Sequence, residues 1–137
     1  MSVAIAITYD GSLRCTATHG PSGQTLLTDA PLDNMGRGEF FSPTDLVATA
    51  LGTCIATTMA IVAERNGLEL AGMKVHVTKE MATQPTRRIG ALPTTISIPG
   101  TFTPEQKRKL EHAAHTCPVH KSLHPEVKAA ITFEWTD

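Results

Sequence analysis

Two cysteines are the residues of this chain most able to do chemistry, and their surroundings differ. Cys54 lies in the uncharged segment "ALGTCIATTM", and Cys117 lies far downstream, directly before a proline in "HTCPVHKSL". The thiolate is the reactive form of cysteine, so reactivity at each position depends on what stabilises the negative sulfur.

Cys117 occupies the expected N-cap of a short helix at 118–124. Unpaired backbone N–H groups and the positive end of the helix dipole favour a thiolate at such a position. His120, one turn on, could accept the thiol proton or add a positive charge. The alternative is a buried cysteine that packs as a small apolar side chain.

The helix that contains Cys54 does not stabilise a thiolate at that position. It lies about twelve residues into a predicted helix, roughly 18 Å from its start, and the dipole acts only over the first turn. Burial among apolar residues raises a thiol pKa. A reactive Cys54 therefore needs a cation from elsewhere, and otherwise Cys54 is a core residue. The arginines outside the predicted helices are Arg14, Arg37, Arg87 and Arg88.

Histidines around Cys117 suggest a metal site as a further hypothesis. Their pattern is H-x2-H-x-C-x2-H-x3-H, and histidine with cysteine suits zinc. However, Pro118 interrupts the helical register, and the spacing matches none of the usual zinc motifs. We expect histidines on a solvated helix surface and no bound metal. The residues concerned are His112, His115, His120 and His124.

The elements that position these residues begin with strands. Apolar residues alternate in 3–8, 13–18 and 24–29, with "YDGS" and "GPSG" as turns, which predicts an antiparallel meander. The irregular segment 30–41 is either a candidate rim for a site or a plain surface crossover. A helix is expected from Ser42, as N-cap, to a stop at Asn66-Gly67.

The second half of the chain predicts strands around one more helix. Strands are expected at 72–81, 94–100 and 127–135, with a loop at 83–93. A T-x-x-Q capping box at Thr103 opens a helix that runs to about Thr116. The order β-β-β-α-β-β-α-β is typical of an α+β fold, with antiparallel sheet packed on helices.

Length and composition predict one globular domain over residues 1–137, with 41% hydrophobic and 18% charged residues. A net charge of −1 gives no electrostatic case for nucleic acid or an anionic membrane. The uncharged run 46–63 reaches the lower limit of a membrane span, but a buried central helix is the preferred interpretation. Three cysteines and an N-terminus unlike a signal peptide predict a cytoplasmic protein with reduced thiols.

Three segments, "SPTDLVATALGTC", "GLELAGMKVHVTKEM" and "RKLEHAAHTCPVHKSL", resemble the OsmC/Ohr family (osmotically inducible protein C and organic hydroperoxide resistance protein). The resemblance covers nearly the whole chain. Its most specific part is a cysteine within an Ala-rich helix opened by x-Pro, followed downstream by Cys-Pro. The resemblance implies an OsmC-like fold: an intertwined α+β homodimer with long central helices packed between sheets from both chains.

The resemblance also implies a cysteine-based peroxidase that protects against oxidative stress by reducing organic hydroperoxides. Cys54 corresponds to the attacking cysteine and Cys117 to the resolving one. Attack on the O–O bond would give a sulfenic acid, which then condenses with the second thiol to a disulfide. No haem, metal or flavin is implied, but an external dithiol must reopen the disulfide. In better-studied members a lipoyl-bearing protein does so.

The family activates its attacking cysteine with an arginine from the N-terminal strands, and Arg14 is the arginine there. Peroxidase members carry Glu directly after the helix-opening proline to hold this arginine, whereas Thr44 stands there in this chain. Asp45 follows, but nine residues at about 100° each turn it to the side opposite Cys54. We therefore expect Asp45 to cap the helix. Glu39 is the other candidate carboxylate.

Two functions of different kinds follow. One is peroxide reduction through Cys54 and Cys117. The other is a non-enzymatic OsmC-like module that binds a small apolar ligand or senses oxidants through the same dimer-interface pocket. The missing glutamate favours the second function.

Overall fold

The structure is a computed structural model that describes residues 1–136. Its internal contacts define two compact units, Met1–Leu46 and Val47–Asp137. The expectation of a single domain over 1–137 stays a prediction. Each unit is described by itself below.

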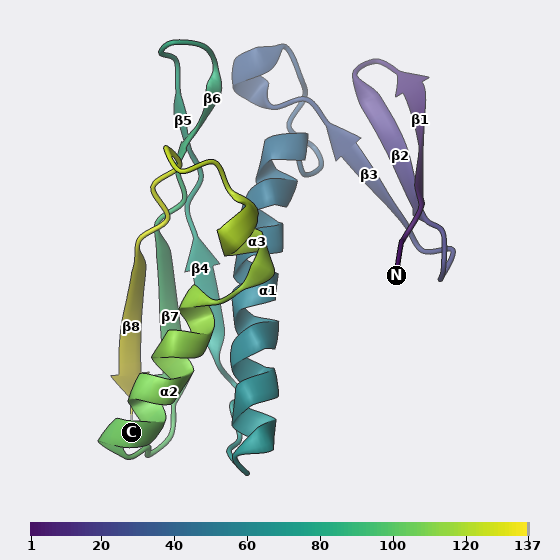
Figure 1. Cartoon of the computed structure of the whole chain (residues 1–137). Helices are drawn as coiled ribbons and strands as arrows, with labels where there is room; N and C mark the ends of the chain where they lie inside the picture. The colour runs from purple at the N-terminus through teal and green to yellow at the C-terminus, as the bar shows by residue number, and fades with distance from the viewer. Residues whose placement is uncertain (137) are drawn as a thin grey trace. The chain divides into compact units, whose positions relative to one another are not determined.

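The first unit contains the predicted meander. Strands β1 (Ile5–Gly11), β2 (Arg14–His19) and β3 (Thr25–Asp29) pair antiparallel in the order β1-β2-β3 (Figure 1). Ile7 lies opposite Ala17, which lies opposite Leu26, so these three residues share one face of the sheet. On this face Ile7 is 67% exposed and Leu26 is 45% exposed, while Ala17 between them is half-buried.

The segment 30–41 returns to the end of β3. It contains a short 3-10 helix, η1 (Leu32–Asn34), after which Met35 adopts a left-handed backbone with φ 72°. The Asp29 N–H then donates to the Phe41 carbonyl over 3.2 Å. This bond ties the far end of the loop to β3.

Helix α1 (Pro43–Arg65) has both predicted ends. Ser42 Oγ accepts the Asp45 N–H at 3.1 Å, and Asp45 Oδ2 accepts the Ser42 N–H at 2.9 Å. At the other end Gly67 has φ 66°, and the Leu68 N–H donates to the Ala63 carbonyl at 2.8 Å, as in a Schellman motif. By length and composition alone α1 is long and apolar enough to cross a membrane. Its buried residues are Ala48, Leu51, Gly52, Ile55, Met59 and Ala63.

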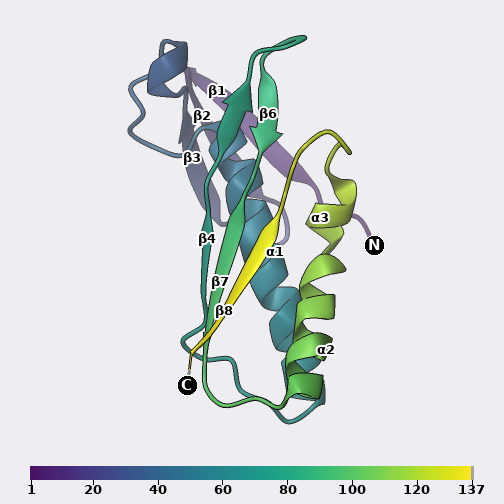
Figure 2. The ribbon, with the colours of Figure 1, turned by 90° about the vertical axis from the view of Figure 1, so that its left-hand side faces the viewer.

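The second unit packs helices on one face of a sheet. Strands β4 (Lys74–Val77), β7 (Thr94–Pro99) and β8 (Ile131–Thr136) form the sheet, in the order β4-β7-β8. Residues 47–65 of α1 and the helices α2 (Pro104–His115) and α3 (Pro118–Ser122) lie on the same side of it (Figures 1 and 2). The α+β class is confirmed. The buried core includes Leu51, Ile55 and Met59 of α1, Ile96 and Ile98 of β7, and Leu110, Ala114 and Cys117.

Strand β8 departs from the expected antiparallel sheet, because it pairs with β7 in parallel. The chain leaves β7, passes through α2 and α3 on one face, and re-enters the sheet in the same direction. Parallel pairing needs such a long crossover, and the two helices supply it.

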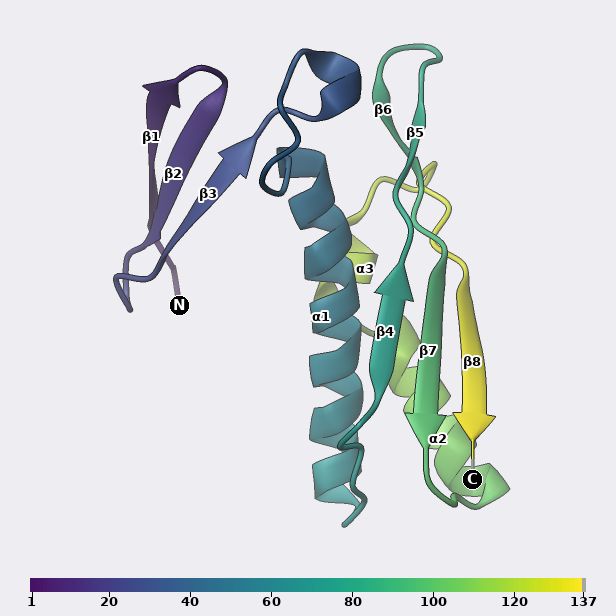
Figure 3. The same cartoon turned by 180° about the vertical axis from the view of Figure 1, so that it is seen from behind.

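A second departure is the strand β6 (Arg88–Ala91), which lies within the predicted loop 83–93. It pairs antiparallel with β5 (Glu80–Ala82), and together they form a hairpin beyond the end of the three-stranded sheet (Figure 3). A Cβ at Gly90 would lie 2.9 Å from that of Ala82, so glycine permits this close approach. The strand is short and contains glycine, so the sequence pattern did not indicate a strand here.

The exposed apolar face of β1–β3 predicts an obligate homodimer, because a large exposed apolar surface marks an interface. Light scattering at micromolar concentration should give twice the mass of the chain. Ile7→Lys, on the apolar face, should weaken the dimer. Thr8→Lys, a neighbour that points to the opposite face, is the matched control and should leave it intact. A stable folded wild-type monomer would contradict the prediction.

Candidate functional site

Cys54 is held in place by close packing of α1 on β4. A Cβ added at Gly52 would lie 3.0 Å from Val77 Cγ2, so glycine allows the helix to approach the strand. Ile55, next to the cysteine, is fully buried. Cys54 itself is half-buried, and its Sγ lies 4.0 Å from Thr58 Oγ1, one helical turn on.

Cys117 lies at the junction of α2 and α3, where it is the N-cap of α3 as predicted. Its Sγ accepts the backbone N–H of His120 over 3.4 Å. The residue is fully buried in the core of the second unit. Both features that the sequence left as alternatives, the cap and the buried apolar packing, are therefore present.

The two thiols influence each other's ionisation, and both cysteines are unoxidised. Burial opposes ionisation of Cys54, but hydrogen bonds from the Cys117 thiol, the Val119 N–H and the Thr58 hydroxyl outweigh it. Together they hold the pKa of Cys54 below the usual value for a thiol. Cys54 is therefore the readier thiolate.

The pKa of Cys117 shifts in the opposite direction to that of Cys54. Burial raises the pKa of the Cys117 thiol, and its hydrogen bond to Cys54 raises it further, although the His120 N–H partly opposes both effects. The helix-dipole argument from sequence, which favoured Cys117 as the thiolate, is wrong for this reason. Burial raises the pKa of Cys117 more than the His120 N–H lowers it. The protonated Cys117 thiol in turn helps to lower the pKa of Cys54.

His120 interacts with Cys117 through its backbone N–H and not through its imidazole ring. Its N–H donates to Cys117, while its ring packs edge-on against His115 with the centroids 6.3 Å apart. His124 Nδ1 accepts the Glu126 N–H over 3.1 Å. Over residues 1–136, no three His, Cys, Asp or Glu side chains converge as a metal site would require.

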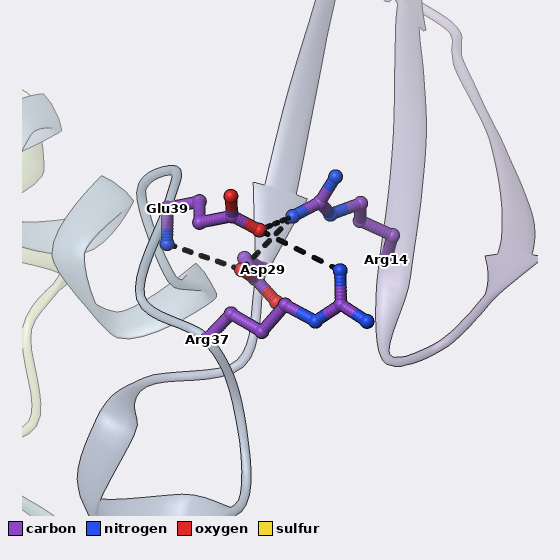
Figure 4. Close-up of polar contacts among 4 residues, drawn as sticks. All are labelled: Arg14, Asp29, Arg37 and Glu39. Carbon is purple, nitrogen blue, oxygen red and sulfur yellow. Dashed lines mark hydrogen bonds and ion pairs between the residues drawn. The ribbon is translucent and has the colours of Figure 1, made fainter.

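Arg14 belongs to a charged cluster within the first unit. Its guanidinium Nη2 lies 3.5 Å from Asp29 Oδ2 and also contacts Glu39 Oε1 (Figure 4). The guanidinium lies over the Phe40 ring, 4.8 Å from its centroid. Arg37 Nη1 approaches the same Glu39 oxygen at 3.9 Å. Two carboxylates and an aromatic ring therefore orient Arg14.

Asp29 is the member of this cluster that the sequence reasoning missed. It pairs with Arg14 across the β2–β3 ladder and is only 1% exposed. The Glu39 N–H, which donates to Oδ2 at 3.1 Å, is the main cause that holds the pKa of Asp29 below its usual value; burial opposes it, and the Ala30 N–H and Arg14 add to it. An aspartate at a strand end, one hairpin away from an arginine, was the available signal.

The remaining predicted residues lie at the start of α1. Asp45 caps the helix as expected, and Thr44 Oγ1 lies 3.2 Å from Ser42 Oγ. Arg14, Glu39 and Asp45 belong to the first unit, whereas Cys54, Cys117 and His120 belong to the second.

Comparisons with solved structures extend over nearly the whole chain. A protein from Psychrobacter arcticus, described as an osmotic stress induced and detoxification response protein, is 39% identical with a TM-score of 0.89, over 94% of this chain and 93% of that one. An organic hydroperoxide resistance protein OsmC from Legionella pneumophila is 15% identical with a TM-score of 0.79, over 98% and 97%.

A further organic hydroperoxide resistance protein, from Vibrio cholerae, carries captopril in one of its active sites. It is 18% identical with a TM-score of 0.76, over 97% of this chain and 91% of that one. At such identities the likeness of the last two structures shows the fold alone. Among curated protein sequences, none matches this chain.

The family model described as OsmC-like protein matches residues 36–132, a range that contains both Cys54 and Cys117. This match covers more than half of the chain, and the Psychrobacter arcticus protein is similar along almost its full length. The chain therefore belongs to the OsmC/Ohr family of OsmC-like proteins.

Proposed function

We propose that this protein is a thiol-dependent peroxidase that reduces organic hydroperoxides through Cys54 and Cys117. The observation that carries the proposal is the pairing of a half-buried Cys54, whose pKa the Cys117 thiol helps to lower, with a fully buried Cys117, whose pKa burial raises. One thiol is thereby prepared to attack and the other to remain protonated. Solved structures of the same fold described as organic hydroperoxide resistance proteins support the same assignment.

The first step uses Cys54 alone. Its thiolate attacks one oxygen of the hydroperoxide, an S–O bond forms, and the O–O bond breaks. The departing alkoxide takes up a proton and leaves as the alcohol, while the sulfur becomes a sulfenic acid. A thiol of lowered pKa is the suitable nucleophile, because more of it is thiolate near neutral pH.

The second step uses Cys117. Its sulfur attacks the Cys54 sulfur, an S–S bond forms, the S–O bond breaks, and the hydroxide leaves as water with the proton of the Cys117 thiol. An external dithiol or lipoyl-type reductant then restores both thiols by exchange. The interaction between the two thiols supports a resolving step within one chain.

Arg14 is proposed to supply positive charge to Cys54, as the resemblance implies. In this chain Asp29 and Glu39 take over the task of the glutamate that Thr44 replaces, since both carboxylates contact the Arg14 guanidinium. Asp45 is assigned to the helix cap instead. The missing glutamate thus does not leave Arg14 without a carboxylate.

The proposal includes a cytoplasmic homodimer that needs no cofactor. Reduced thiols are the default in that compartment, and the reaction then uses only the two cysteines and an external reductant. Small hydroperoxides with an apolar tail are the proposed substrates.

The first prediction concerns the disulfide. Treatment with an organic hydroperoxide should give one intramolecular Cys54–Cys117 disulfide, identified by mass spectrometry. Cys54→Ser should abolish peroxide consumption, whereas Cys117→Ser should trap sulfenic acid and stop turnover after one cycle. Cys15→Ser is the control and should keep full activity. If the wild type consumes no hydroperoxide with any dithiol, the binding or sensing module becomes the assignment.

A second prediction concerns the Arg14 cluster. Arg14→Ala should slow the first step on the order of tenfold, which corresponds to about 1.4 kcal/mol. Glu39→Gln and Asp29→Asn should slow it in the same direction, because a loosened guanidinium stabilises the thiolate less. Arg37→Ala removes a mostly exposed side chain at the edge of the cluster and is the matched control. Equal rates for Arg14→Ala and Arg37→Ala in stopped-flow assays would refute the role of Arg14.

A third prediction concerns metal. Elemental analysis of the purified protein should find no stoichiometric zinc, and a chelator should leave the melting temperature unchanged, because a structural metal would add its binding free energy to folding. A zinc content near one per chain would restore the histidine-site hypothesis.

A further inference from the structure

Thr58 is a polar residue beside the candidate nucleophile. It follows Cys54 by four residues on α1, so both side chains lie on one face of the helix, and both are half-buried. Its Oγ1 lies 4.0 Å from Cys54 Sγ. It is one of the groups that lower the pKa of Cys54, and it takes part in neither bond-forming step of the proposed reaction.

The position of the Thr58 hydroxyl sets it apart from another threonine of the same helix. A helical threonine commonly donates its hydroxyl to a carbonyl in the preceding turn. Thr53 does so, with its Oγ1 2.8 Å from the Thr49 carbonyl. Thr58 Oγ1 instead lies near a sulfur, which is a weak acceptor as a thiol and a strong one as a thiolate.

The three donors to Cys54 differ in what happens to them during the proposed reaction. The Cys117 thiol gives up its proton when it forms the disulfide, so its help ends with the resolving step. The Val119 N–H belongs to the backbone and is the same whatever the side chain. Thr58 is the side-chain donor that neither reacts nor is oxidised.

Within the second unit, the groups that stabilise the Cys54 thiolate are neutral donors and not charged side chains. Over residues 47–136, the interactions that shift the ionisation of Cys54 come from Cys117, Val119 and Thr58. On α3, the nearest titratable side chain after Cys117 is that of His120, whose ring packs against His115. Each neutral donor therefore has a measurable share in the stability of the thiolate.

We propose that the Thr58 hydroxyl donates a hydrogen bond to the Cys54 thiolate and holds that sulfur ready for attack. The inference rests on the proposed function for its biological meaning. It can be tested without peroxide, because alkylation of a thiol depends on the same thiolate.

The test measures the rate of alkylation of Cys54 by iodoacetamide against pH, with the modified peptide followed by mass spectrometry. Thr58→Val removes the hydroxyl, which lowers the stability of the thiolate, so the midpoint should move to higher pH and the rate at neutral pH should fall about three- to tenfold. Thr58→Ser keeps a hydroxyl and should restore most of the rate.

Thr57→Val is the matched control, since it makes the same change at the adjacent exposed position and should leave the profile unchanged. Melting curves verify that each variant is folded. A Thr58→Val profile equal to that of the wild type would overturn the inference, as would an equal shift in Thr57→Val. If the wild type fails to consume peroxide while the Thr58 shift is present, the peroxidase function is lost and the inference about Thr58 stands.

Discussion

The interaction of the Cys117 thiol with Cys54 is the one on which the proposed chemistry depends. The fully buried Cys117 keeps its proton, and the half-buried Cys54 loses its proton more readily. Burial makes ionisation of Cys117 costly, and the donated proton makes ionisation of Cys54 cheaper. The pKa values of two chemically identical side chains thus shift in opposite directions, and the proposed order of reaction rests on that difference.

Several structural features serve to bring these two sulfurs together. Gly52 lets α1 lie against Val77 of β4, which sets the depth of Cys54 in the second unit. Helix α2 ends at His115 with Thr116 as its C-cap, so that Cys117 can cap α3 and the Val119 N–H can interact with Cys54. The first backbone N–H groups of a helix lack partners within it, and α3 uses two of them on the two sulfurs.

The capped and strongly periodic elements could be predicted from the sequence because their signals are local. The Ser42 cap, the stop at Gly67 and the Thr103–Gln106 capping box involve residues within a few positions of one another. Strand β6 was missed because it is short and contains glycine, so its local pattern is weak. The antiparallel pairing expected for β8 was wrong, because its pairing depends on a partner distant in the chain. The pairing of Arg14 with Asp29 was missed for the same reason, since it depends on the register of two strands.

The sequence by itself determined the identity of the two cysteines, the helices that hold them and the resemblance to the OsmC/Ohr family, which the comparisons confirm. From the sequence, the helix dipole favoured Cys117 as the thiolate, whereas the resemblance implied that Cys54 attacks first. Only the tertiary structure decided this point. Whether a thiol ionises depends on how deeply it is buried and on which donors reach it, and for Cys54 two of the three donors come from residues far away in the chain.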